Sequence, residues 1–312
     1  MPKAAAPDTT PPAPGRATPA LRHTAASLRR AAAALRHGPL MASALGRTGL
    51  GLAGLALLFA VLGPVVATHQ PDTVDLGAKL HAPDGEHWFG TDQFGRDQFA
   101  RLTAGARRSL LAAFTVLAGS CTVSLVVGVV AGLARGFADA VLMRVVDIVL
   151  AIPSLVLALA VVGVLGPGFG NLLLALVISS WAANARIVRA FTLAVRDRPY
   201  IAAARLGGAG PARIAVGHVL PAVVPRLLVV ATLQLGGTIV SLAGLSFLGL
   251  GAQPPTAELG AMLGDARAFV TVAPWLLAAP TTVVLVVTAA ATLVGDAVRD
   301  ATHHSAVEEV HP

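Results

Sequence analysis

Few residues of this chain could take part in chemistry, and they are widely spaced. Arg144 and Asp147 lie three positions apart within an apolar stretch, so on a helix they share one face and can pair. If that stretch crosses a membrane, each charge costs about 2.5–3.5 kcal/mol to insert, which makes both residues functional candidates. Two hypotheses remain open. One is a proton or ion relay, and the other, which we favour, is a neutralised pair that holds the helix in register.

A short polar stretch holds four residues with metal-binding atoms: His81, Asp84, Glu86 and His87. Their spacing matches no fixed ligand pattern, so we expect no metal site. The chain also lacks the Gly-x-x-x-x-Gly-Lys-Ser/Thr loop that holds nucleotide phosphates. We therefore expect no catalytic residue and no bound cofactor, and any ATP-driven work must come from partner chains.

Two amides, Asn184 and Gln234, also interrupt apolar runs. They can join helices through hydrogen bonds or contact a transported solute, and we favour the first. Gly236 and Gly237 follow closely, and such small residues allow either close helix packing or room for a passage.

The amino-acid composition indicates whether these residues lie in a soluble or a membrane protein. Hydrophobic residues make up 55% of the 312-residue chain and charged residues 12%, with a mean hydropathy of +0.74. Soluble domains carry about 25% charged residues, so this is a membrane protein. The net charge of +7 lies mainly at the ends of apolar runs, as the positive-inside rule requires. We therefore expect lipid contact and no nucleic-acid partner.

Six apolar segments are long enough to cross a membrane, which needs about 20 residues each. This pattern predicts an all-α membrane protein with six transmembrane helices, and Pro153 should kink the third. The segments are Thr48–Ala67, Ser109–Ala134, Ala140–Leu165, Asn171–Ala190, Val223–Leu248 and Pro274–Gly295.

The positive charges predict the orientation. With a basic N-terminal tail at 1–47 inside the cell, 17 of the 23 Lys and Arg residues fall on the cytoplasmic side. Both termini are then cytoplasmic, including a short tail at 303–312. The long segment at 68–108 becomes extracytoplasmic, where its aspartates offset the arginines around Arg101.

The segment at about 191–221 joins the fourth and fifth spans. Alanines, a glycine pair at 207–208 and then Leu220-Pro221 predict a helix, a turn and a return to the membrane. This loop resembles the EAA loop of permease subunits of bacterial ATP-binding-cassette (ABC) importers. That pattern reads Glu-Ala-Ala, three residues, Gly, nine residues, Ile, any residue, Leu-Pro. The matching residues are Ala203, Ala204, Gly208, Leu220 and Pro221, whereas Ala202 replaces the Glu and His218 the Ile.

Three further stretches resemble the dipeptide, oligopeptide and nickel branch of these permeases: 89–97, 246–255 and 295–300. The resemblance covers about residues 48–302. One departure is Leu259, where relatives usually have Trp before the glycine that is Gly260 here.

The resemblance implies a type I ABC importer permease in the bacterial inner membrane, with its permease core at 109–302. It implies four kinds of partner: a second homologous permease, two ATPases that bind ATP and magnesium, an extracytoplasmic solute-binding protein, and lipid. The residues expected to couple to the ATPases are Tyr200, Ala202, Ala203, Ala204, Arg205, Leu206, Gly207, Gly208, Arg213, Leu220 and Pro221.

The expected cargo is a dipeptide or oligopeptide, with nickel or another small solute as the alternative. A different class, a secondary transporter driven by an ion gradient, would predict an internal repeat with acids at the membrane centre. The sequence shows no such repeat. A membrane scaffold that transports nothing would leave the loop at 191–221 unexplained.

Overall fold

The computed structural model describes residues 44–134 and 136–308, with side chains to residue 300. Most of the predicted tails at 1–47 and 303–312 therefore lies outside the described side chains. Within the described part the regular secondary structure is helical, apart from one isolated bridge between Thr91 and Asp97. The prediction of an all-α membrane protein is confirmed.

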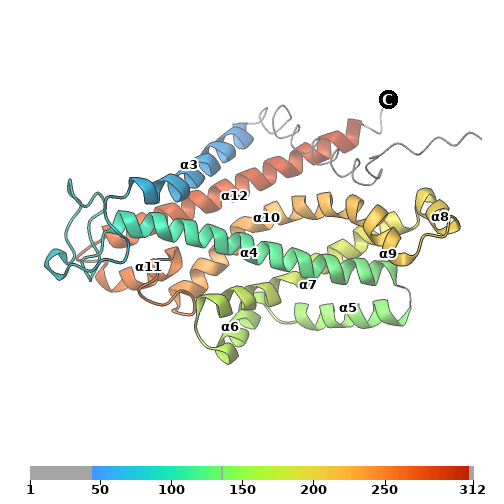
Figure 1. Ribbon diagram of the computed structural model, residues 1–312, viewed down its shortest axis with the longest axis horizontal. Coiled ribbons are helices and arrows are strands. Elements are labelled where there is room, and N and C mark those ends of the chain that lie inside the picture. The colour runs from blue at the N-terminus through green and yellow to red at the C-terminus, as the bar shows by residue number, and fades with distance from the viewer. Residues whose placement is uncertain (1–43, 135, 309–312) are drawn as a thin grey trace, which may run out of the picture.

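Five helices are long and apolar enough to cross a membrane, and Figure 1 shows them running along the length of the molecule. They are α3 (Ala44–Val66), α4 (Gln98–Leu133), α7 (Phe169–Arg196), α10 (Leu220–Phe247) and α12 (Trp275–Glu308). One end of the bundle carries α8 (Pro199–Leu206) and α9 (Pro211–Ile214), and we name it the α8 end. The other carries the loop at 67–97 and α11 (Leu259–Ala266), and we name it the α11 end.

The third predicted span is broken. Instead of one kinked helix over Ala140–Leu165, the chain forms α5 (Phe137–Leu150) and α6 (Ser154–Leu165), which meet at 89°. Pro153 explains the break, because it lacks an N–H group and disfavours a helical conformation at the preceding residue. The 14 residues of α5 extend only about 21 Å, whereas the apolar core of a bilayer is about 30 Å thick. The two helices can therefore complete a sixth span only together.

The interface between α4 and α7 is built on small residues. A Cβ atom added at Gly128 would lie 2.6 Å from Val188, and one added at Gly132 would lie 2.5 Å from Thr192. Ser124 donates a hydrogen bond to the backbone oxygen of Trp181, at 2.7 Å. The two helices therefore approach backbone to backbone, as small residues permit in membranes.

The α11 end is closed by a buried polar network. Arg96 donates to Asp92 at 2.6 Å, and Arg101 reaches both Asp92 and Asp72, at 3.4 and 3.3 Å. Arg101 also donates to the backbone oxygen of Pro255, at 3.1 Å, so the network joins the loop at 67–97 to the segment before α11. The prediction that local aspartates offset the arginines around Arg101 is confirmed for Arg101 itself, whereas Arg108 donates to the backbone oxygen of Ala257.

Turns in the same loop depend on glycine and on side-chain hydrogen bonds. Gly90 and Gly95 both have φ of +71°, a region that other residues enter at a cost. The carboxylate of Asp84 accepts the backbone N–H groups of Glu86 and His87 at 2.9 and 2.6 Å. The hydrogen bond from His87 is the main reason that the pKa of Asp84 lies below its ordinary value.

We predict that Gly95→Ala destabilises this loop by about 2 kcal/mol or more, because the left-handed conformation is strained for alanine. The new Cβ would also lie 1.6 Å from the backbone oxygen of Asp75. Thermal unfolding in detergent, followed by tryptophan fluorescence, measures the effect. Gly85→Ala is the matched control, since a Cβ there meets nothing within 4 Å and the melting temperature should not change. Equal melting temperatures for the two variants would contradict this account of the loop.

Candidate functional site

The short helix α8 begins and ends at residues suited to those positions. Pro199 occupies its first turn, where the missing N–H removes no hydrogen bond. At its end the N–H of Ala209 bonds to the oxygen of Ala204 and that of Gly208 to the oxygen of Arg205, each at 3.0 Å. This pair of bonds is a Schellman cap, and it requires the φ of +79° found at Gly208.

One face of α8 is bare. Leu206 is 91% exposed, Tyr200 is half exposed, and Ala202, Ala203 and Arg205 are also exposed. We name this patch the α8 surface; it comprises Tyr200, Ala202, Ala203, Arg205 and Leu206. Tyr200, Leu206 and the two alanines form an exposed apolar patch on one short helix, and such patches commonly mark protein contacts.

The remaining predicted coupling residues take other positions. Gly207, Gly208 and Arg213 are exposed in the turn and in α9, beside the α8 surface. Ala204 is partly buried, and Leu220 and Pro221 are partly buried at the first turn of α10. Leu220 packs against the core below α8.

The opposite face of α8 is anchored. Ile201 is fully buried in a cluster with Ile214 of α9 and Val219, which directly precedes α10. The same cluster includes residues of α4, α7 and α10: Val129, Val188, Val195, Val223 and Leu227. The buried face of α8 and three long helices therefore share one continuous apolar cluster.

His218, which replaces an Ile of the family pattern, lies in a π-helical turn (Ala215–Val219) just before α10. Its ring stacks on Tyr200, with centroids 6.4 Å apart and planes at 22°. Its Nδ1 atom is buried and has no hydrogen-bond partner among the described residues. The histidine thus adds an aromatic contact between α8 and the start of α10.

A second feature is a cavity of about 470 Å³ beside the break between α5 and α6. Residues of α4, α5, α6, α7 and α10 line it, together with Pro153 at the break, and we name it the α5–α10 groove. Its polar lining consists of hydroxyl and amide side chains: Ser154, Ser179, Ser180, Gln234, Thr238 and Ser241. The described lining includes no acidic or basic side chain.

The structure brings Asn184 and Gln234 together. Their amides exchange two hydrogen bonds of 2.8 and 2.7 Å, and Asn184 is fully buried between α7 and α10. Gln234 also lines the groove, as does Gly237. A Cβ at Gly236 would instead lie 2.9 Å from Thr292, so this glycine lets α10 pack closely on α12.

The predicted pairing of Arg144 with Asp147 is wrong. Asp147 pairs with Arg186 of α7, and nearer the start of α5 Asp139 accepts two hydrogen bonds of 2.6 Å from Arg189. From the sequence, helix periodicity predicts only partners about one turn away on the same helix. In the folded chain α5 packs against α7, whose arginines pair with both aspartates. The two ion pairs tie the broken span to α7.

The hydroxyl residues of the groove are not among the site residues predicted from the sequence. A signal was present, because Ser180 and Ala183 on α7, and Gln234, Thr238 and Ser241 on α10, recur at the three- to four-residue spacing of one helix face. Single serines in apolar runs are common, so the spacing alone does not predict a site. The structure shows that these faces of α7 and α10 line one groove.

Comparison with known proteins agrees with this architecture. Residues 124–304 match the family described as "Binding-protein-dependent transport system inner membrane component". The chain belongs to this family and is a multi-pass membrane protein, a permease subunit of an ABC importer.

The relatives place it within the peptide and nickel branch of these permeases. The nickel transport system permease protein NikC of Escherichia coli K12 is 41% identical over 81% of this chain and 92% of its own length. The probable D,D-dipeptide transport system permease protein DdpC of the same strain is 40% identical, over 84% and 88%. The dipeptide transport system permease protein DppC of Alkalihalophilus pseudofirmus is 37% identical, over 84% and 86%.

We predict that the Asn184–Gln234 amide pair contributes about 0.6–1.7 kcal/mol of coupling between α7 and α10, the range of such bonds in membranes. A double-mutant cycle of Asn184→Ala, Gln234→Ala and the double variant, followed by unfolding in detergent, measures this energy. The double variant should be less destabilised than the sum of the single variants. Strictly additive losses would show that the two amides do not stabilise the helix pair together.

Proposed function

We propose that this chain forms half of the translocation pathway of a peptide importer and that ATPase subunits drive it through the α8 surface. The observation that carries the proposal is the two-sided character of α8. Its outer face presents Leu206, 91% exposed, while its inner face fixes Ile201 in the core that α4, α7 and α10 share. A helix with one exposed face and one buried face can be moved by a bound partner and can transmit that movement to the core of the bundle.

In this proposal the α8 end faces the cytoplasm. Arginines of α7, α8, α9, α10 and the turn before α8 gather toward this end, as the positive-inside rule favours: Arg189, Arg196, Arg198, Arg205, Arg213 and Arg226. The start of α3 and the end of α12 also point toward this end in Figure 1, so the proposed orientation assigns both to the cytoplasmic side of the bacterial inner membrane.

Each proposed partner binds a different surface of the chain. Two ATPase subunits carry ATP and magnesium, and the α8 surface of each permease docks in a groove on one of them. The second permease subunit, similar to this one, covers the open side of the α5–α10 groove. An extracytoplasmic solute-binding protein delivers cargo to the α11 end.

The transport step is a change of helix positions without covalent chemistry. When ATP draws the ATPases together, the two α8 helices move with them. The buried cluster around Ile201 transmits this movement to α4, α7 and α10, and the ion pairs from α7 move α5 as well. The groove then opens toward the opposite side, alternating its access.

The groove lining favours a peptide as the cargo. Hydroxyl and amide groups can exchange hydrogen bonds with peptide groups without binding any one side chain tightly. Nickel prefers imidazole, thiolate or carboxylate ligands, and the described lining offers none of them. Nickel remains the second candidate because NikC is 41% identical to this chain.

Uptake into vesicles that contain the complete importer separates these cargoes and energy sources. The proposal predicts ATP-dependent accumulation of a radiolabelled dipeptide and no uptake of radioactive nickel. Nickel uptake alone would support the second candidate. Dipeptide uptake that needs only a proton gradient and no ATPase subunit would instead indicate a secondary transporter.

We predict that Leu206→Asp, and separately Ala203→Glu, abolishes co-purification with the ATPase subunits and lowers ATP-driven uptake at least about tenfold. Each change places a charge in the centre of an apolar contact, where truncation or replacement commonly costs 2 kcal/mol or more. Both residues are exposed, so the variants should fold and insert normally. Co-purification and vesicle uptake are the two measurements.

Leu76→Asp is the matched control, because Leu76 is 65% exposed at the α11 end. It should leave the ATPases bound. Retention of the ATPases by both α8 variants would rule out the docking role.

A further inference from the structure

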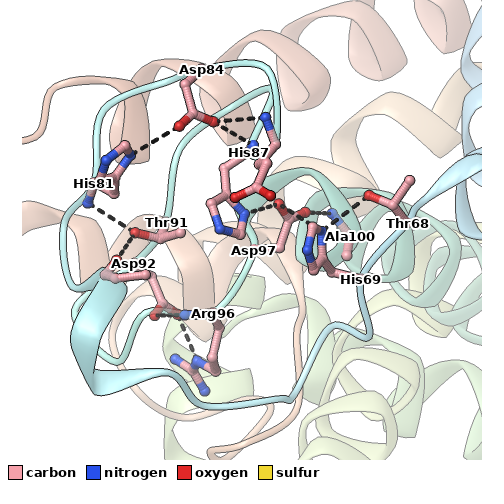
Figure 2. Close-up of polar contacts among 12 residues, drawn as sticks. Thr68, His69, His81, Asp84, His87, Thr91, Asp92, Arg96, Asp97 and Ala100 are labelled. Atoms are coloured by element: carbon pink, nitrogen blue, oxygen red, sulfur yellow. Dashed lines mark hydrogen bonds and ion pairs between the residues drawn. The ribbon is translucent and has the colours of Figure 1, made fainter.

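We propose that His69, His87 and Asp97 form a binding site for one divalent transition-metal cation, of the zinc, nickel and copper class, at the α11 end. The three residues are spread along the loop at 67–97. His69 lies near its start, just after α3, His87 lies further along it, and Asp97 directly precedes α4. Figure 2 shows both imidazole rings turned toward the Asp97 carboxylate, and one ligand atom from each residue lies within 4.8 Å of the other two.

The distances suit a small cation. His87 Nδ1 lies 2.8 Å from Asp97 Oδ2, and His69 Nδ1 lies 3.8 Å from the same oxygen. Ligand atoms around a tetrahedral zinc ion are separated by about 3.4 Å, because each lies about 2.1 Å from the metal. The two distances to Asp97 bracket that value, and the ligand atoms of the two histidines lie within 4.8 Å of each other, so side-chain rotations can bring the three atoms onto one ion.

The ligand residues are held by the fold around them. Asp97 Oδ1 caps α4 by accepting the N–H of Ala100 at 2.7 Å, while Oδ2 is hydrogen-bonded to His87 Nδ1 at 2.8 Å, a contact that a bound cation would replace. The backbone N–H of His87 is fixed by Asp84 at 2.6 Å. The two histidine rings lie against each other, with centroids 4.7 Å apart. Such supporting contacts orient metal ligands and limit the cost of binding.

Burial gives the site a closed side and an open side. The Asp97 side chain is 5% exposed and that of His87 is 16%, whereas that of His69 is 42% exposed. A cation can therefore enter past His69, whose Nδ1 now lies 3.0 Å from the hydroxyl of Thr68. Three protein ligands leave a fourth position for water or for a donor from another molecule.

The donor set identifies the class of cation. Two imidazole nitrogens and one carboxylate oxygen suit zinc, nickel and copper, whereas magnesium and calcium prefer oxygen ligands alone. His81 forms its own contact with Asp84, at 3.5 Å, and is not part of this cluster. The bound ion would join the end of α3 to the first turn of α4 and stabilise the loop between them.

Zinc titration of the purified full-length chain in detergent tests the site, with metal first removed by a chelator and no polyhistidine tag present. We expect one zinc ion per chain and a rise in melting temperature on binding. His69→Ala should weaken zinc binding by about tenfold or more and abolish the thermal shift. His69 is the best residue to change because it is the most exposed of the three ligands.

Two controls keep the interpretation specific. His81→Ala removes a neighbouring histidine outside the cluster and should leave both measurements unchanged. The double variant His303→Ala/His304→Ala tests the adjacent histidines near the C-terminus and should also bind zinc normally. Zinc binding that is absent in the unaltered chain, unaffected by His69→Ala, or lost equally in a control variant would overturn the proposal. None of these outcomes depends on transport or on the ATPase contact.

Discussion

The close approach of α4 and α7 is the contact on which the rest of the structure depends. Gly128 and Gly132 allow this approach, because any side chain there would collide with Val188 or Thr192. Apolar side chains gain little by leaving lipid for a protein interior, so close packing and hydrogen bonds must hold membrane helices together. The bond from Ser124 to the backbone of Trp181 adds to this interface. Because α7 is fixed against α4, its remaining surface can hold further helices in place.

From α7 the structure extends in two directions. Along the chain, α7 leads directly into α8, whose buried Ile201 returns the contact to the core. Sideways, Arg186 and Arg189 hold α5, and the amide of Asn184 holds α10. The groove beside Pro153 lies among these same helices. The surface that would receive a driving force and the space that would hold a cargo thus share one helix.

The sequence predicted those features that depend on local composition. Apolar length located the spanning helices, and the glycine pair after α8 located its C-terminal cap, because both follow from the chemistry of a few neighbouring residues. Features that depend on distant partners were missed or wrong. Asp147 pairs with Arg186, 39 positions away, rather than with Arg144. At Pro153 the span breaks into two helices and does not merely kink, because α6 packs separately against α7. His69, His87 and Asp97 meet only through the fold of the loop, so no spacing in the sequence marks them as a group.

The central claim is that α8 transmits force because Ile201 anchors it to the bundle. The most direct measurement is ATP-driven uptake by vesicles that contain the complete importer with Ile201→Ala, alongside co-purification of the ATPase subunits. This change removes buried contacts beneath α8 and leaves its exposed surface intact. The account predicts that the ATPases remain bound while uptake falls by about tenfold or more. Uptake at the unaltered rate, with the ATPases still bound, would contradict it.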